Sequence, residues 1–226
     1  MLLRSWLIAG ALAAAAALAT GCGSPEDRAP IERAALDDWK IKPGVRVGSM
    51  NRASSELDLA QAYGYSNVRD SIITLGEGER SRGTLVFPTD PQRRFEVVWG
   101  DAALKREPQR IVLRGERSRW MLPGDISLGT RLIDLERMNG RPFRLSGFGW
   151  DYSGAVISWN GGALDSLLTG VKLYLEPRIE NQAGRAYHRV QGDKPFESTN
   201  PDLRSLDPRV YQIFVDLAPP LPGRTP

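Results

Sequence analysis

The sequence predicts an α+β fold in which helices pack on antiparallel sheet. Short runs rich in Val, Ile, Phe and Trp follow one another along the chain and are separated by Gly- and Pro-rich turns, which is typical of strands. Two helical stretches, residues 53–63 and 130–139, each stand before a group of these runs. Because strands joined by tight turns pair antiparallel, we expect helices against an antiparallel sheet and not a parallel α/β fold.

The order of these elements indicates an internal repeat. A Pro-Gly turn at residues 43–44 leads to a short strand, the first helix and Gly64. A second Pro-Gly turn at residues 123–124 leads to the same succession, and its helix ends at Gly140. A glycine after a helix favours a left-handed C-cap. We therefore expect two strand–helix–sheet repeats, at residues 39–120 and 121–218.

The first helix has a candidate buried side and two candidate caps. Leu57, Ala60 and Gln61 lie on one side of a helical projection. Ser54 or Ser55 can provide the N-cap, because serine side chains accept a hydrogen bond from the first turn.

The second helix has a more regular pattern. Leu132, Leu135 and Met138 are spaced i, i+3, i+6, which predicts a stripe facing the core. Thr130 is the expected N-cap.

The strand runs alternate between buried and exposed positions. We expect strands at residues 72–75, 84–87, 95–99, 111–114, 143–148, 155–159, 171–176 and 210–217. Phe95, Val97 and Trp99 form one buried face. In the last run Tyr211, Ile213, Val215 and Leu217 are expected to share a face.

Residues 184–208 are polar and contain three prolines. We expect a long irregular loop here, and loops of this length are often functional. Disorder is the alternative interpretation of the same composition.

The N-terminus has the pattern of a secretory signal. Arg4 precedes an apolar, alanine-rich run at residues 7–18, and small residues lead to Cys22, the single cysteine. The apolar run is shorter than the roughly 20 residues that a membrane-spanning helix needs.

The segment Leu18-Ala19-Thr20-Gly21-Cys22 resembles the lipobox of bacterial lipoproteins, with Ala where the family more often has Leu. The resemblance implies removal of residues 1–21 and acylation of Cys22, with palmitate-type chains holding the protein to the membrane. An ordinary cleaved signal with a free cysteine is the alternative. Because Gly and not Asp follows Cys22, the lipoprotein rules imply the outer membrane, with the protein facing the periplasm.

Two terminal segments differ from the body in composition. Residues 22–38 are polar and contain two prolines, which predicts a flexible tether. Residues 219–226 form a proline-rich tail that we do not expect to pack.

Charge argues against a nucleic-acid partner. The net charge is +3, and basic residues are interleaved with acidic ones without a polybasic block or a nucleic-acid motif. We expect a mixed, solvated surface, and a membrane contact through the acyl chains.

Catalytic and cofactor chemistry has little support in the residue pattern. His188 is the single histidine, and no G-x-S-x-G elbow accompanies it. Zinc sites usually require several His or Cys ligands, so we expect no metal and no cofactor. Carboxylate pairs could support glycan hydrolysis, and the candidates are Glu77, Glu79, Asp101 and Asp151. A solvated turn for the first two is the plainer interpretation.

The aromatic residues are better candidates for binding. Trp99 and Trp159 end apolar runs and are expected in the core. Trp150, Asp151 and Tyr152 lie in a glycine-rich segment and form the predicted binding site, since Trp and Tyr are enriched at interfaces. The alternatives are that Trp150 and Tyr152 close the core at a bend, and that Asp151 caps a turn.

The second copy, with Leu128-Gly129-Thr130, Asn139-Gly140-Arg141-Pro142 and Trp150-Asp151-Tyr152, is similar to the beta-lactamase-inhibitor-like fold. The first copy matches through Val47-Gly48-Ser49-Met50 and Tyr63-Gly64. The chain also resembles an uncharacterised family of bacterial secreted proteins through residues 147–154. The fold resemblance implies protein binding without catalysis, with an envelope protein as the expected partner. A glycan-binding or small-ligand-binding module and a carboxylate-dependent cell-wall hydrolase are the alternatives.

Overall fold

The computed structural model describes residues 38–217 except residues 77 and 116. The signal segment, Cys22, all but the last residue of the tether, and the proline-rich tail lie outside the described residues. The described chain is mixed α+β with antiparallel sheets, as the sequence predicts. All described residues belong to one compact unit, residues 31–226.

The largest element is a six-stranded antiparallel sheet in the order β10-β12-β7-β6-β5-β4. Its strands are β4 (Val68–Gly76), β5 (Glu79–Val86), β6 (Phe95–Asp101), β7 (Arg106–Arg114), β10 (Val171–Glu176) and β12 (Arg209–Asp216). Because β12 pairs with β7, strands from the two expected repeats share one sheet.

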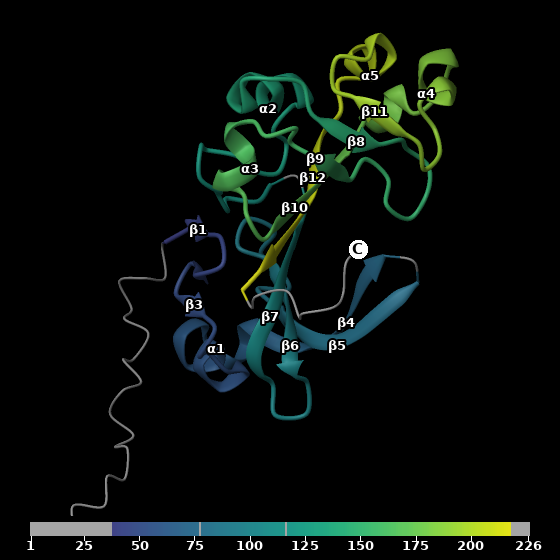
Figure 1. The fold of residues 1–226 in the computed structure, drawn as a ribbon. Helices are drawn as coiled ribbons and strands as arrows, with labels where there is room; N and C mark the ends of the chain where they lie inside the picture. The colour runs from purple at the N-terminus through teal and green to yellow at the C-terminus, as the bar shows by residue number, and fades with distance from the viewer. Residues whose placement is uncertain (1–37, 77, 116, 218–226) are drawn as a thin grey trace, which may run out of the picture. The chain divides into compact units, whose positions relative to one another are not determined.

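In the described part of the chain, two smaller sheets and five short helices accompany the large sheet (Figure 1). The small sheets are β1-β2-β3 (Ile41–Lys42, Arg46–Val47, Met50–Asn51) and β11-β8-β9 (Pro195–Glu197, Arg144–Ser146, Val156–Ser158). The helices are α1 (Glu56–Tyr63), α2 (Leu132–Asn139), α3 (Ala163–Leu167), α4 (Arg185–Arg189) and α5 (Pro201–Leu206), with 3-10 turns η3 (Tyr65–Asn67) and η4 (Ile179–Asn181). α2 packs beside α3, and α4 beside α5.

Both faces of the large sheet are covered by apolar side chains. The main core includes Phe95, Val97 and Trp99, which confirms the predicted face of β6. A second cluster contains Ile73, Val98, Val112, Tyr174 and Phe214. Val98 is therefore buried as well, because the sheet buries side chains on both sides here.

The predicted face of the last strand is wrong at one residue. Ile213 and Val215 are in the main core, but Tyr211 packs against the second cluster. The register between β10 and β12 shifts between Tyr174 and Leu175, so β12 has a bulge that places Tyr211 on the opposite face. A bulge cannot be seen in an alternating sequence pattern.

Helix α1 is capped as predicted but is buried on a partly different side. Ser55 forms a capping box with Asp58. Leu57 is 55% exposed, whereas Leu59 and Ala60 are buried. Of the expected side, Ala60 is buried but Leu57 and Gln61 are exposed, because the helix faces the core through Leu59, Ala60 and Tyr63, which are spaced i, i+1, i+4.

Helix α2 confirms its predicted stripe: Leu132 and Leu135 are buried, and Met138 packs against the core. Its cap differs from the prediction. Arg131 is the N-cap without a side-chain bond, and Thr130 instead accepts a hydrogen bond from the backbone of Ser127.

Residues 184–208 are not an irregular loop. They form α4, β11 and α5. Asn200 caps α5 by accepting hydrogen bonds from Asp202 and Leu203, and Pro201 occupies the first turn. The polar residues that suggested a loop are thus helix-starting and turn residues.

The β4–β5 hairpin extends beyond the rest of the sheet and runs across the direction of β6 and β7 (Figure 1). β5 pairs with β6 only from Gly83 to Val86, while its earlier residues pair with β4 alone. A Cβ on Gly83 would lie 2.3 Å from Ile73 Cδ1 and 2.3 Å from the carbonyl oxygen of Val97. Glycine therefore allows the close approach that bends the hairpin over the second cluster.

Candidate functional site

Trp150, Asp151 and Tyr152 lie in the bend between β8 and β9. The Trp150 indole donates a hydrogen bond to the carbonyl of Gly147 at 3.0 Å, and its ring meets the Tyr152 ring edge-on at 5.5 Å. Tyr152 packs against the second cluster, while the Asp151 side chain is exposed. The two aromatics therefore close the bend, and Asp151 is the residue that faces outward.

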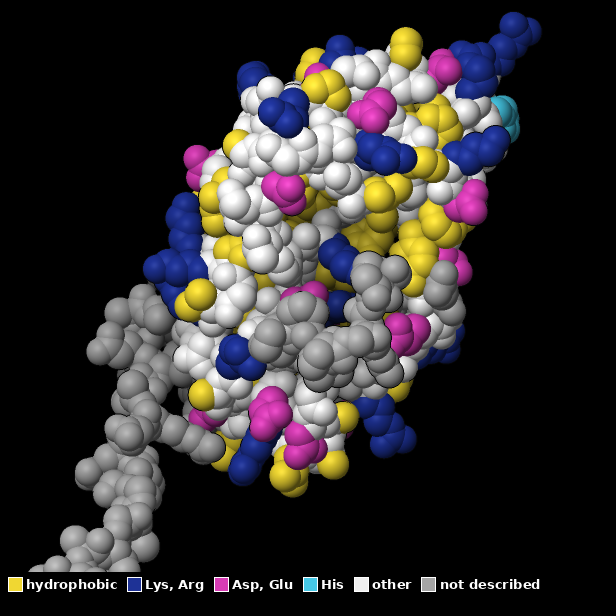
Figure 2. Space-filling model, in the orientation of Figure 1, with side chains coloured by type: hydrophobic (Ala, Val, Ile, Leu, Met, Phe, Trp, Pro, Cys, Tyr) yellow, Lys and Arg dark blue, Asp and Glu magenta, His cyan; other side chains and the backbone are white. Residues whose placement is uncertain are grey.

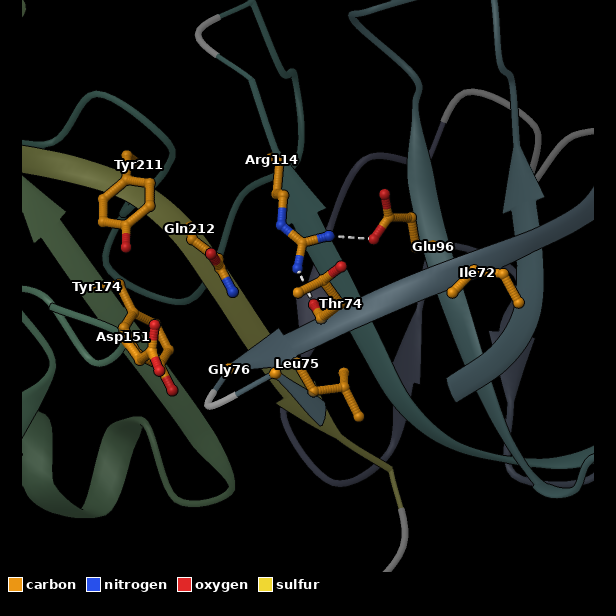
Figure 3. Close-up of a pocket in the computed structure, with 11 residues that line it drawn as sticks. Ile72, Thr74, Leu75, Gly76, Glu96, Arg114, Asp151, Tyr174, Tyr211 and Gln212 are labelled. Carbon is orange, nitrogen blue, oxygen red and sulfur yellow. Dashed lines mark hydrogen bonds and ion pairs between the residues drawn. The ribbon is translucent and has the colours of Figure 1, made fainter. Parts of the chain in front are cut away.

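Asp151 opens onto a pocket of about 410 Å³, which we call the sheet pocket. It is lined by Ile72, Thr74, Leu75, Gly76, Gly78, Glu96, Arg114, Asp151, Tyr174, Tyr211 and Gln212. Figure 3 shows Tyr174, Tyr211 and Asp151 on one side and the β4 residues on the other, with Arg114 and Gln212 between them. Trp150 and Tyr152 are not lining residues, so of the predicted trio Asp151 alone reaches this pocket directly.

The hairpin brings β4 to the pocket, and Tyr152 supports it there. A Cβ on Gly76 would lie 3.2 Å from the Tyr152 ring. The end of β4 thus rests close to the bend that carries Asp151.

Arg114, which lies between the two sides of the pocket, is already bonded to Glu96 and to the backbone of Thr74. Arg114 on β7 forms an ion pair with Glu96 on β6, whose side chain is only 12% exposed. The same guanidinium donates a hydrogen bond to the carbonyl oxygen of Thr74 at 2.5 Å. Arg114 therefore holds β4 to the sheet, and Glu96 does not present its carboxylate freely.

The tyrosines of the pocket remain protonated. Burial raises the pKa of Tyr211 to about 12, with the nearby Glu176 adding to the effect. Burial also raises the pKa of Tyr174, although Arg110 opposes it. Both hydroxyls are consequently hydrogen-bond donors, and neither is a base, at neutral pH.

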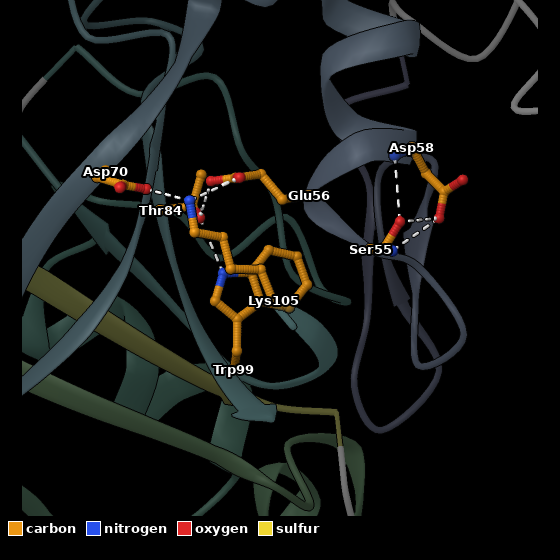
Figure 4. Close-up of polar contacts among 7 residues, drawn as sticks. All are labelled: Ser55, Glu56, Asp58, Asp70, Thr84, Trp99 and Lys105. Carbon is orange, nitrogen blue, oxygen red and sulfur yellow. Dashed lines mark hydrogen bonds and ion pairs between the residues drawn. The ribbon is translucent and has the colours of Figure 1, made fainter. Parts of the chain in front are cut away.

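A second pocket of about 350 Å³, the helix pocket, lies between α1 and the start of β4. It is lined by Glu56, Leu57, Ala60, Tyr65, Val68, Arg69, Asp70 and Lys105. Figure 4 shows Lys105 reaching both Glu56 and Asp70. Hydrogen bonds to Asp70 and Glu56 raise the pKa of Lys105, so this amine is a charged ion-pair partner and not a nucleophile.

The Lys105 ion pairs continue into the core. Glu56 accepts a hydrogen bond from the Thr84 hydroxyl at 2.7 Å, and Thr84 accepts one from the Trp99 indole at 2.8 Å. Thr84 is fully buried. This chain of bonds attaches α1 to the sheet, which is a structural role.

The other candidate catalytic residues are not brought together with Asp151 in the sheet pocket. His188 is exposed and faces Gln191 at 3.1 Å. Asp101 accepts hydrogen bonds from the backbones of Ala103 and Leu104, so it stabilises a turn. Glu79 starts β5, and Glu77 lies outside the described residues.

Within the described residues, no group of three or more His, Cys, Asp or Glu side chains could hold a metal ion.

Sequence reasoning missed most of the pocket. Glu96 and Gln212 interrupt apolar runs in β6 and β12, and that interruption is the signal that could have found them, whereas Arg114 ends β7 and has no such signal. Figure 2 shows basic and acidic side chains interspersed over the visible face.

Comparison with family models, curated proteins and solved structures found no match to this chain. In the part of the chain that the structure describes, no helix is long and apolar enough to cross a membrane.

Proposed function

We propose that this protein is a membrane-anchored lipoprotein of the bacterial envelope that binds another protein without catalysis. The observation that carries the proposal is the sheet pocket, in which donors and acceptors from β4, β7, β12 and the 147–154 bend face one space. A pocket of this size with convergent polar groups is a binding site by default.

The groups in the pocket support binding better than catalysis. Glu96 is held by Arg114, and the tyrosines have raised pKa values, so none is set up as a base at neutral pH. Of the two carboxylates among the described lining residues, Glu96 and Asp151, Asp151 is the one that faces outward. An exposed carboxylate offers charge complementarity to a partner, and among the described lining residues no second free carboxylate accompanies it for glycan hydrolysis.

The proposed anchor is the acylated Cys22, with the body in the periplasm at the outer membrane. The support is the lipobox-like segment at residues 18–22. Cys22→Ser should abolish incorporation of labelled palmitate and release the protein from the membrane fraction. Unchanged labelling would refute the anchor without bearing on the pocket.

We also propose that the body derives from two diverged beta-lactamase-inhibitor-like repeats. The support is that α1 and α2 each lead through a glycine, Gly64 or Gly140, into antiparallel strands. The two glycines differ in conformation: Gly140 is left-handed, whereas Gly64 has φ 91° and ψ 138°. The shared large sheet is consistent with fusion of the two copies.

In-cell crosslinking of the full-length protein, followed by identification of what co-purifies, tests the binding function. The matched variants are Asp151→Lys and Asp193→Lys, because both aspartates are exposed and lie in turns but only Asp151 lines the pocket. We expect one dominant envelope protein that is lost with Asp151→Lys and kept with Asp193→Lys. Equal recovery from both variants would refute the pocket as the binding site.

A glycan ligand is the second candidate, favoured by the tyrosine hydroxyls and the Gln212 amide in the pocket. Tryptophan fluorescence with cell-wall fragments separates the candidates, since Trp150 is adjacent to Asp151 in the chain and its ring contacts the ring of Tyr152. Saturable quenching that disappears in Tyr211→Phe would favour the glycan; no change would favour the protein partner.

A further inference from the structure

The outer edge of β4 is open along a long strand. β4 is the last strand of the six-stranded sheet, and within the described residues no strand pairs with its other edge. It has nine residues, and the stretch from Ser71 to Leu75 carries no charge. Ile72 in the middle of that stretch is 58% exposed. An open, uncharged edge of this kind is a template for pairing with another strand.

The hydrogen-bond register identifies the backbone groups that this edge offers. The carbonyl of Asn67 accepts a bond from the amide of Phe87 at 2.8 Å, in register with the β4–β5 ladder. Residues of an antiparallel pair alternate between bonding to the partner and pointing away from it. The main-chain groups of Val68, Asp70, Ile72 and Thr74 therefore point away from β5. The N–H of Val68 is already bonded to the carbonyl of Tyr65, which leaves Asp70, Ile72 and Thr74 as the candidates for pairing.

An independent contact confirms this parity. The carbonyl oxygen of Thr74 accepts its hydrogen bond from Arg114, which is on β7 and not on β5. The carbonyl of Thr74 thus points away from β5, as the alternation of hydrogen-bonded residues counted from Asn67 predicts.

The sheet pocket and the helix pocket both lie along this same edge. Residues Val68, Arg69 and Asp70 line the helix pocket, and residues Ile72, Thr74, Leu75 and Gly76 line the sheet pocket. Strand addition uses main-chain bonds for affinity and pockets for alternate side chains. The edge of β4 provides both.

The space beside β4 suits one extended segment better than a second sheet. Tyr174, Tyr211 and Asp151 stand across the sheet pocket from β4 (Figure 3). The β4 strand of a second copy would arrive attached to its own β5 and would meet this wall. A single strand has no such neighbour and can enter between the two sides.

The charge of Asp151, across the sheet pocket from β4, determines which side chain of the bound segment would be favoured there. The structure gives Asp151 no hydrogen bond or ion pair with the described residues, whereas Glu96 is paired with Arg114. A cationic side chain that enters the sheet pocket would therefore find its carboxylate in Asp151, with the Tyr174 and Tyr211 rings nearby.

We propose that β4 binds one extended segment of another polypeptide by strand addition, and that a Lys or Arg of that segment reaches Asp151. This inference rests on the proposed protein-binding function and specifies its surface and its ligand. The main-chain groups of Asp70 and Ile72 and the N–H of Thr74 form the ladder, because the Thr74 carbonyl is already bonded to Arg114, and Asp151 selects the charge.

The first test uses a blocked synthetic peptide, Thr-Val-Thr-Lys-Thr-Val-Thr, with the full-length protein in micelles. Amide hydrogen exchange read by NMR should slow at Ile72 and Asp70 and stay unchanged at Ser71 and Ile73, whose amides already point to β5. The same peptide with Glu in place of Lys should bind about tenfold more weakly, because an attraction to Asp151 becomes a repulsion.

The matched variants are Ile72→Pro and Ile72→Ala. Both remove the exposed isoleucine side chain, but only proline removes the outward N–H, and edge strands tolerate proline. We expect Ile72→Pro to lose peptide binding and Ile72→Ala to keep it within about threefold, since only the side-chain contact changes. If Ile72→Pro does not fold, a peptide N-methylated at alternate residues tests the same bonds on the unaltered protein and should not bind.

Three results would overturn the inference. The first is an absence of slowed exchange at saturating peptide, or equal slowing at Ser71 and Ile72. The second is slowing that appears without peptide as protein concentration rises, together with a dimer mass in sedimentation, which would assign the edge to a second copy. The third is a change in the NMR signals of Tyr174 and Tyr211 on addition of cell-wall fragments, with amide exchange in β4 unchanged.

The inference and the proposed function can fail separately. An envelope protein captured in cells through Asp151 but leaving β4 exchange unchanged would refute strand addition and keep the binding function. Loss of both peptide binding and cellular capture would refute both.

Discussion

Removing the Thr84 hydroxyl should destabilise the protein by about 2–4 kcal/mol. Thr84 is fully buried, accepts a hydrogen bond from the Trp99 indole at 2.8 Å and donates one to Glu56 at 2.7 Å. Thr84→Val keeps the shape but leaves the indole N–H buried without a partner, which costs about 1–3 kcal/mol, and removes a bond to a carboxylate worth about 1.5–3 kcal/mol. The gain from the added methyl offsets part of this sum.

Urea unfolding of the purified protein, followed by tryptophan fluorescence, measures the change in free energy of unfolding. At about 2–4 °C per kcal/mol for a chain of this size, the melting temperature should fall by roughly 10 °C. Thr84→Ser is the control, because it keeps the hydroxyl and loses a methyl group at about 1 kcal/mol. The reasoning is refuted if the serine variant is as unstable as the valine variant.

Three further predictions concern Gly83 in the β4–β5 hairpin and the titrating groups Tyr211 and Asp207. Gly83→Ala should destabilise by more than about 2 kcal/mol, since overpacking against backbone cannot relax, whereas Ser81→Ala on the same strand should change the free energy of unfolding little. Because the pKa of Tyr211 is raised to about 12, its contribution to stability is present below pH about 10 and is lost as pH rises towards 12; Tyr211→Phe should flatten that loss in alkaline unfolding curves. Burial raises the pKa of Asp207, but hydrogen bonds from two arginines outweigh it and hold that pKa below its usual range, so its stabilisation is present at neutral pH and lost on acidification. Asp207→Asn should then show a shallower loss of stability below pH about 4, and an unchanged acid slope would contradict this.

Local regularity explains which parts of the fold the sequence predicts. β10 has the bounds predicted for it, residues 171–176, and the α2 stripe is buried as its spacing indicates. Both depend on side-chain period alone. The buried side of α1 was predicted only in part because apolar residues surround this short helix and the period alone does not choose between them; Leu59 and Tyr63 face the core, and Leu57 faces solvent.

Long-range geometry explains what the sequence does not predict. Tyr211 reaches the sheet pocket through a bulge, and Arg114 meets Thr74 because a hairpin bends over the sheet at Gly83. Asp151 could be selected from its glycine-rich segment, but its neighbours in space are far away in the chain. Pairings of this kind depend on the assembled sheet and not on local propensity.

The place of β12 in the sheet has a consequence for biogenesis. The last strand of the described chain lies between β10 and β7, and its residue Ile213 pairs with Leu113, a hundred positions earlier. Because the N-terminal part of the chain is synthesised first, the edges of β7 and β10 that pair with β12 remain unpaired until residues 209–216 are available. Contacts of such separation slow folding. A chain interrupted before Arg209 would therefore keep unpaired edges on β7 and β10 and would not form the six-stranded sheet.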